Sequence, residues 1–242
     1  MTSVVVSSPY VAQGNTLKRL MIQVIIALLP GTFAYAWYFG PGVVINICLA
    51  VLAALAFEAV ILKLRARPVM PHLTDFSAVV AAWLFALCLP MHSPWWLVLV
   101  GIGFTMIAGK HLYGGLGFNP FNPAMVGYVV LLISFPREMT TWYLPNSVSG
   151  EGLGLLDALA YSFAGADIRQ WDALSSATPL DQVKTAVAQG ISVTEIRLSP
   201  VFGEYGGKGW EWIAFWWFVG GLWLLFTRTI RWHIPTALLV AV

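Results

Sequence analysis

The stretch from Leu20 to Phe39 reads LMIQVIIALLPGTFAYAWYF and decides the class of the protein. It carries no charged side chain, and about twenty helical residues at 1.5 Å each span a hydrocarbon core of roughly 30 Å. Lys18 and Arg19 precede it, and Ala34, Tyr35 and Ala36 resemble a signal-peptide cleavage triplet. The long lead-in and the apolar residues beyond that triplet favour an uncleaved first transmembrane helix over a signal peptide.

The composition agrees with a membrane protein. Of 242 residues, 59% are hydrophobic and 10% are charged, whereas soluble domains carry roughly a quarter charged residues. A soluble globular enzyme is therefore excluded. The net charge of +2 gives no basic footprint, so we expect no nucleic-acid partner. Cys48 and Cys88 lie in apolar runs without metal-ligand spacing, so we interpret them as packing residues.

Further apolar stretches predict an all-α polytopic membrane protein with six full or partial transmembrane helices and the start of a seventh. The stretches are Gly42 to Leu62, Phe76 to Leu89, Trp95 to Gly109, Pro123 to Phe135 and Trp210 to Thr227, followed by Pro235 to Val242. The second and third of these are about 21 and 22 Å long at helical rise, too short for a full crossing. We divide the chain into an N-terminal membrane bundle (1–136), a long external loop (137–209) and the start of a second membrane half (210–242).

Basic residues orient these helices, because short cytoplasmic loops are enriched in Lys and Arg. If the N-terminus is cytoplasmic, eight of the thirteen Lys and Arg residues lie on the cytoplasmic side: Lys18, Arg19, Lys63, Arg65, Arg67, Lys110, Arg228 and Arg231. The other five share the segment 137–209 with eight acidic residues. Connections of that length are uncommon without a function of their own. We therefore expect segment 137–209 to be periplasmic or external and to carry the chemistry.

A few ionisable residues lie at or near the predicted membrane segments. Glu58 is either an interfacial carboxylate paired with Lys63 and Arg65 or part of an ion path. Asp75 either caps the third helix or handles ions. A haem bundle needs inward imidazoles at membrane depth, which is not expected for the four histidines, because all lie in loops or at helix ends: His72, His92, His111 and His233. Two cysteines are too few to ligate an iron–sulfur cluster.

Within the external segment, Thr178, Pro179 and Asp181 predict a helix start. Threonine is favoured at the N-cap and proline at the first helical position, and an aspartate three residues after the cap can bond back to it. We expect the helix to continue as far as the stop at Gly190. Helix capping alone would explain why these three residues occur together.

The same region also resembles a recognition motif for flavin transferases. In that motif an Asp is followed three to six residues later by Ser or Thr, Gly, Ala and Thr; this chain has Asp172, Ser175, Ala177 and Thr178, with Ser176 in place of the glycine. The resemblance implies that Thr178 carries FMN through a phosphoester attached by an exported flavin transferase. Its external placement suits that attachment.

A loop of Gly, Asn and Pro residues between Lys110 and Met125 adds a second resemblance. It is no dinucleotide fingerprint, because no strand precedes it and its glycine spacing is wrong. Together with Thr74, Asp75, Ser77 and Ala78, with Leu89 and Pro90, and with the stretch Ile133 to Trp142, it resembles the RnfD/NqrB family of membrane flavoproteins. That family includes the D component of the Rnf ion-translocating complex and the B component of the sodium-pumping quinone reductase. Ser8, Pro9 and the short N-terminus favour the Rnf branch.

The resemblance implies about ten helices in two inverted halves, one external covalent FMN and a second, non-covalent flavin. Gly115, Asn119 and Asn122 are our candidates for the second flavin region. Because the sequence ends after about six and a half helices, we expect a truncated two-repeat bundle that is inactive in isolation. No metal site is expected.

The implied function is that of a subunit of an ion-translocating oxidoreductase in the bacterial inner membrane, which passes electrons through FMN beside other subunits of its complex. Two alternatives stay open. A flavin-free transporter or channel-like permease would explain the short helices, and a purely structural assembly subunit would need no cofactor. In both, Thr178 is a helix cap only.

Overall fold

The computed structural model describes residues 16–149, 153–165 and 177–241. Within these ranges the regular elements are helices, and an isolated β-bridge pairs Phe202 with Gly207. The apolar helices are α1 (Leu17–Phe39), α2 (Gly42–Leu64), α4 (Ser77–Leu87), α5 (Trp95–Phe104), α6 (Pro123–Ser134), α13 (Trp210–Phe226) and α14 (His233–Ala241). Their positions confirm the predicted spans and the all-α polytopic class. Among the described helices, α1 and α2 are long and apolar enough to cross a membrane by length and composition, and the others are shorter.

The fourth predicted span is longer than the sequence suggested. Helix α5 continues into a π-helical turn, η1 (Thr105–His111), in which the Leu112 amide donates to the Ile107 carbonyl at 2.8 Å. The prediction that this segment ends at Gly109 and that Lys110 lies in a loop was therefore wrong. A π-turn has one extra residue per hydrogen-bonded ring, and here Lys110 and His111 are both buried although they are adjacent.

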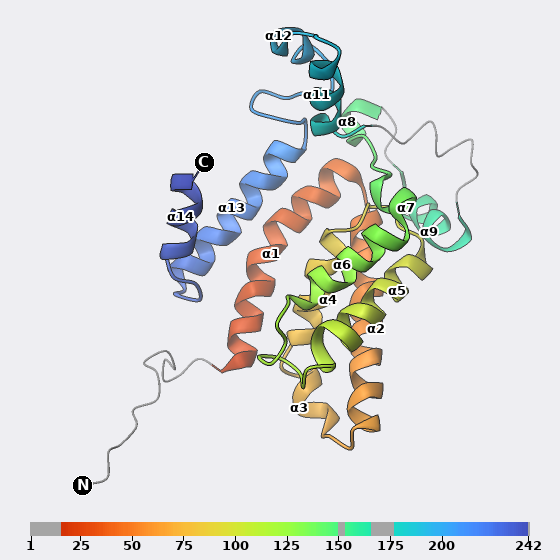
Figure 1. Cartoon of the computed structure of the whole chain (residues 1–242), viewed down its shortest axis with the longest axis vertical. Helices are drawn as coiled ribbons and strands as arrows, with labels where there is room; N and C mark the ends of the chain where they lie inside the picture. The colour runs from red at the N-terminus through yellow and green to blue at the C-terminus, as the bar shows by residue number, and fades with distance from the viewer. Residues whose placement is uncertain (1–15, 150–152, 166–176, 242) are drawn as a thin grey trace.

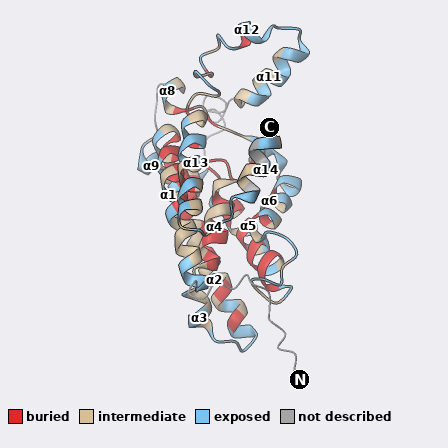
Figure 2. Cartoon of the chain, turned by 90° about the vertical axis from the view of Figure 1, so that its left-hand side faces the viewer, coloured by how far each residue is buried: buried red, intermediate tan, exposed pale blue. Residues whose placement is uncertain are grey.

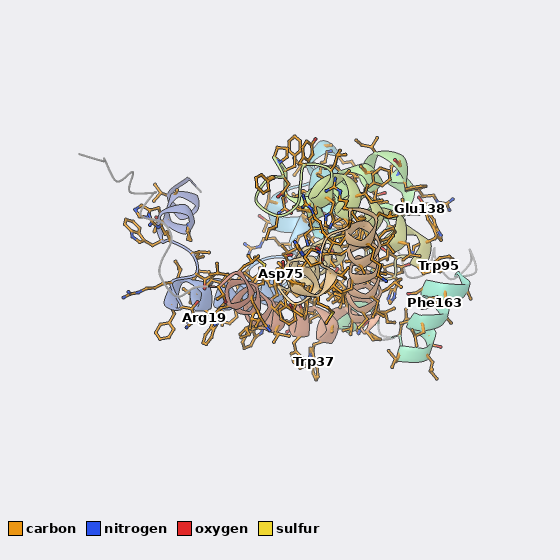
Figure 3. The ribbon with its side chains drawn as sticks, turned by 90° about the horizontal axis from the view of Figure 1, so that it is seen from below. Arg19, Trp37, Asp75, Trp95, Glu138 and Phe163 are labelled. Carbon is orange, nitrogen blue, oxygen red and sulfur yellow. The ribbon has the colours of Figure 1, made fainter. Side chains whose placement is uncertain are left out.

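The helices form a bundle whose buried residues lie where α1, α2, α4, α5 and α6 meet (Figure 2). Helix α2 packs on α4 and α5, α6 packs on α5 and η1, and α13 packs along α1. In the end-on view Trp37 lies at the rim and Asp75 over the bundle (Figure 3), and Trp37 is 72% exposed. Apolar side chains on the outside of such a bundle are expected where lipid is the solvent.

The described parts of segment 137–209 contain five short helices joined by irregular stretches. They are α7 (Pro136–Thr140), α8 (Asn146–Ser149), α9 (Leu155–Ala164), α11 (Pro179–Ala188) and α12 (Val193–Ile196). Figure 1 places α8, α11 and α12 at the end of the molecule opposite α3 (Val69–Leu73) and the start of α1. The acidic segment and the basic helix connections are thus separated along the bundle, as the sequence predicts.

Candidate functional site

Thr178 begins helix α11 in the way that the sequence predicts. Its backbone is extended, and its hydroxyl accepts a hydrogen bond from the Asp181 amide at 3.3 Å while donating to the Asp181 carboxylate at 2.6 Å. Pro179 occupies the first helical position, and Gly190 follows the helix with φ of 77°. The predicted N-cap is therefore confirmed. The hydroxyl at the helix start has the local geometry of a cap, and the Thr178 residue is half-buried.

The other motif residues lie partly outside the described structure. Three motif positions lie in the range 166–176, outside the described residues: Asp172, Ser175 and Ser176, which stands in place of the motif's glycine. Ser8 and Pro9 also lie outside the described residues. Ala177 is exposed, and its carbonyl accepts a hydrogen bond from the Gln182 side chain at 3.2 Å. This contact ties the residue before Thr178 to the first turn of α11.

Thr178 faces a small pocket built from three separate parts of the chain. The pocket is lined by Trp142, Tyr143, Leu144, Pro145, Ala177, Thr178, Pro179, Val201, Lys208 and Trp210. Trp142 follows α7, and Trp210 is the first residue of α13. The sequence prediction missed both tryptophans and Lys208. The sequence could have indicated only the two tryptophans, because tryptophan is enriched where a membrane helix meets a polar segment.

A short hairpin brings Lys208 to this pocket. The Gly203 amide donates to the Gly206 carbonyl at 2.7 Å and the Lys208 amide to the Val201 carbonyl at 2.8 Å. Gly207 lies directly against Pro179, because a Cβ atom at Gly207 would come within 2.5 Å of the proline Cγ. The hairpin and the start of α11 are therefore in close contact only because position 207 has no side chain.

A second polar cluster lies inside the bundle, toward its other end. Lys110 Nζ donates to Glu58 Oε1 at 2.5 Å and to Ser77 Oγ at 2.8 Å. Ser77 Oγ in turn donates to Asp75 Oδ1 at 2.6 Å. His111 Nε2 lies 3.5 Å from Glu58 Oε1. Three helical segments, α2, α4 and η1, and the turn before α4 thus meet around one buried carboxylate.

This cluster corrects one interpretation of Glu58 and confirms one of Asp75. Glu58 is fully buried and pairs with Lys110, so the pairing with Lys63 and Arg65 was wrong; Arg65 instead donates to the His111 carbonyl at 2.8 Å. The sequence placed Lys110 in a loop because hydropathy cannot detect a π-turn. Asp75 caps α4 as predicted, since its carboxylate accepts from the Ser77 amide at 2.7 Å.

The candidates for a second flavin region lie in the exposed loop between η1 and α6. Gly115 has φ of 113°, a conformation that favours glycine. Asn119 accepts from the Gly117 amide at 3.2 Å and donates to the Phe121 carbonyl at 2.7 Å. Asn122 caps α6 through the Ala124 amide at 3.0 Å. Each residue has a local structural role, and the flavin role stays a prediction.

Comparison with known proteins agrees with the earlier resemblance. The D component of an ion-translocating oxidoreductase complex from Citrobacter koseri is 45% identical over 246 residues, an alignment that covers 98% of this chain and 70% of that protein. Proteins of the same name from Salmonella newport and Salmonella enteritidis are 45% and 44% identical over the same shares. A model of the NQR2, RnfD, RnfE family matches residues 4–242. With its helical bundle and a match over nearly its whole length, this multi-pass membrane protein belongs to the NQR2, RnfD, RnfE family.

Proposed function

We propose that the chain is a membrane flavoprotein subunit of an ion-translocating electron transport complex of the Rnf type, with FMN joined to Thr178. Its relatives are named as the D component of an ion-translocating oxidoreductase complex. Partner subunits supply and remove electrons, and an exported flavin transferase attaches the FMN. The protein lies in the inner membrane with its N-terminus in the cytoplasm and segment 137–209 outside. The isolated chain is inactive.

The observation that carries this proposal is the Thr178 hydroxyl at the start of α11, beside two indoles and a lysine. A phosphodiester there would lie at the positive end of the helix dipole, which favours an anion. Lys208 can supply a positive charge, and Trp142 and Trp210 can supply aromatic surface. These residues suit the phosphate end of a linked flavin, whereas the pocket itself, at about 10 Å³, is too small to enclose the flavin ring.

When bound, the flavin supplies the electron chemistry, and the chain supplies attachment, position and electrostatics. Thr178 fixes the phosphate end at the outer end of the bundle. Because α13 begins at Trp210 and packs along α1, this position is coupled directly to a pair of membrane helices. A second, non-covalent flavin in the region of Gly115, Asn119 and Asn122 is part of the same proposal, and it is supported by the family resemblance alone.

A denaturing gel tests the attachment. The chain is produced together with a flavin transferase, denatured and viewed under ultraviolet light. We expect a fluorescent band for the native sequence and a dark band for Thr178→Val, which keeps the β-branched shape but has no hydroxyl. An equally bright Thr178→Val band would contradict the proposal, and a dark native band would favour the flavin-free permease.

A further inference from the structure

Helix α9, in segment 137–209, presents an exposed apolar face. Leu156 is 80% exposed and Phe163 is 54% exposed, and Ala160 between them is exposed as well. The three residues follow one another at helical spacing, so they lie on one face of α9. Large apolar side chains that are exposed together mark a binding surface rather than a face in contact with water.

A different face of α9 holds it against the bundle. Ala158 and Ser162, one helical turn apart, are buried, and α9 packs on α2. The Tyr161 ring lies near the His92 ring in the connection between α4 and α5, with centroids 6.1 Å apart. Leu159 is half-buried and lies between the packed face and the exposed one. The exposed apolar face is therefore additional to the face that packs on the protein.

Contacts of the chain before α9 fix its depth along the bundle. Gly40 lies in the turn between α1 and α2, the two described helices long enough to cross a membrane. The Leu153 carbonyl lies 3.8 Å from the position of a Cβ atom at Gly40. Trp37, near the same end of α1, is 72% exposed, and tryptophan favours the headgroup layer. Since membrane-crossing helices end in that layer, α9 begins at its level.

Helix α9 lies across the bundle rather than along it. Figure 1 shows α1 and α2 running along the long axis of the molecule. Figure 3, which looks along that axis, shows α9 along its length beside the bundle, with Phe163 on it. A helix that lies flat in a bilayer surface has this direction, and it turns its apolar face toward the acyl chains. Asp157 is the only charged residue in the α9 sequence.

We propose that α9 is an interfacial helix whose exposed apolar face binds lipid in the leaflet at this end of the bundle. Its depth, its direction and its position beside the lipid-facing side of α2 select lipid as the occupant. At 10 residues the helix is short for binding a membrane on its own, but its packing on α2 already holds it there. The inference does not depend on a flavin, and it adds a membrane contact that holds segment 137–209 close to the bilayer.

Fluorescence quenching tests this placement. The full chain with Cys48→Ala and Cys88→Ala receives one new cysteine, is labelled there with the dye NBD and is held in lipid nanodiscs. Some of the phosphatidylcholine carries a nitroxide near the top of an acyl chain. For Leu156→Cys and Phe163→Cys we expect severalfold quenching by the nitroxide lipid and little quenching by iodide in the water. Lys184→Cys, on the exposed side of α11, should show the reverse.

Asp157→Cys is the matched control within α9, because Asp157 is exposed but lies outside the apolar face. Its label should respond to iodide more than the labels at 156 and 163 do. A second pair of variants tests what holds the face in lipid. In the chain labelled at Phe163→Cys, Leu156→Asp should reduce quenching by the nitroxide lipid severalfold, whereas Leu156→Met, which stays apolar, should preserve it.

Three results would overturn the proposal. Labels at 156 and 163 that iodide quenches as strongly as the label at 184 would show that the face lies in water. Labels shielded from both quenchers would show that protein, such as a second copy of the chain, covers the face. Equal quenching by the nitroxide lipid at 156, 157 and 163 would show that no one face of α9 is turned toward the acyl chains. All three can be observed with or without FMN on Thr178, so this inference and the proposed function fail separately.

Discussion

At the scale of single residues, the Glu58–Lys110 pair is the least expected feature of the bundle. A buried charge without a partner is strongly unfavourable, and even a paired one must offset the loss of water through additional hydrogen bonds. Lys110 meets this condition with Glu58 and Ser77, and Ser77 is in turn bonded to Asp75. The pair therefore joins α2 to η1 through a contact that tolerates little change on either side.

Removing one partner should destabilise the fold more than removing both. We expect Glu58→Gln to lower the free energy of unfolding by about 3–5 kcal/mol, because the Lys110 ammonium stays buried without its counter-charge. Adding Lys110→Met should restore most of that loss. Thermal unfolding in detergent measures both, with the exposed Glu204→Gln as a control. A double variant that is less stable than Glu58→Gln alone would contradict this account.

His92 gives a pH dependence at the opposite end of the bundle. It lies in the connection between α4 and α5, in edge-to-face contact with Tyr143, with ring centroids 4.8 Å apart. Burial lowers its pKa to about 4, from an ordinary value of 6.5. Between these values the unfolded state binds a proton that the folded state does not. Stability should therefore fall as the pH drops from 6.5 to 4, by about 3 kcal/mol in all.

His92→Gln should reduce that acid sensitivity, because the amide does not titrate. Unfolding midpoints at pH 7 and pH 4.5 measure the difference, and His233→Gln, an exposed histidine at the start of α14, is the control. If His92→Gln and the native sequence lost equal stability on acidification, His92 would not be the group responsible.

At the scale of elements, the packing of α13 on α1 depends on small residues. Membrane helices approach closely where glycine or alanine faces the neighbour. At Gly220 a Cβ atom would come within 2.0 Å of the Ala27 carbonyl oxygen, and at Gly31 it would collide with the Trp217 indole. No side chain larger than hydrogen fits at either position without moving a helix. This crossing also fixes the position of Trp210, which lines the pocket beside Thr178.

Two adjacent glycines in α13 test the crossing. Gly220→Leu should separate α13 from α1 and lower the thermal unfolding midpoint, whereas Gly221→Leu should have little effect, because nothing lies within 4 Å of a Cβ atom there. Both variants have the same composition and the same gain in helix propensity. Equal midpoints for the two would show that the contact with Ala27 does not limit stability.

The sequence predicted the helices better than their ends or their partners. Hydropathy located α1, α2 and α13 to within a few residues, because a run of about twenty apolar residues is rare outside membrane helices. It could not show the π-turn that buries Lys110, since an i to i+5 pattern has no composition of its own. The cap at Thr178 was predictable from local chemistry, whereas Trp142 and Lys208 approach it only through tertiary contacts.

At the scale of the whole molecule, the two ends of the bundle differ in charge. Segment 137–209 has a net charge of −3, and its helices α8, α11 and α12 lie at the end opposite α3 (Figure 1). From the positive-inside rule we expect the Thr178 end to lie outside the cytoplasm. Under the proposed function, a flavin at Thr178 would then be an electron carrier on the outer side of the membrane.

Cysteine labelling in intact cells tests this orientation. In a background with Cys48→Ala and Cys88→Ala, a cysteine at the exposed Glu195 should react with a reagent that does not cross the inner membrane. A cysteine at the exposed Arg67 should react only after the membrane is opened. The reverse pattern would show that segment 137–209 faces the cytoplasm, where an exported transferase could not reach Thr178.

The central claim, that FMN is joined to Thr178, is tested most directly by mass spectrometry of the chain purified from cells that also produce the flavin transferase. We predict an intact mass higher by one FMN less one water, with fragmentation that assigns the added mass to Thr178. A fully matured sample in which the peptide containing Thr178 is unmodified would contradict the account.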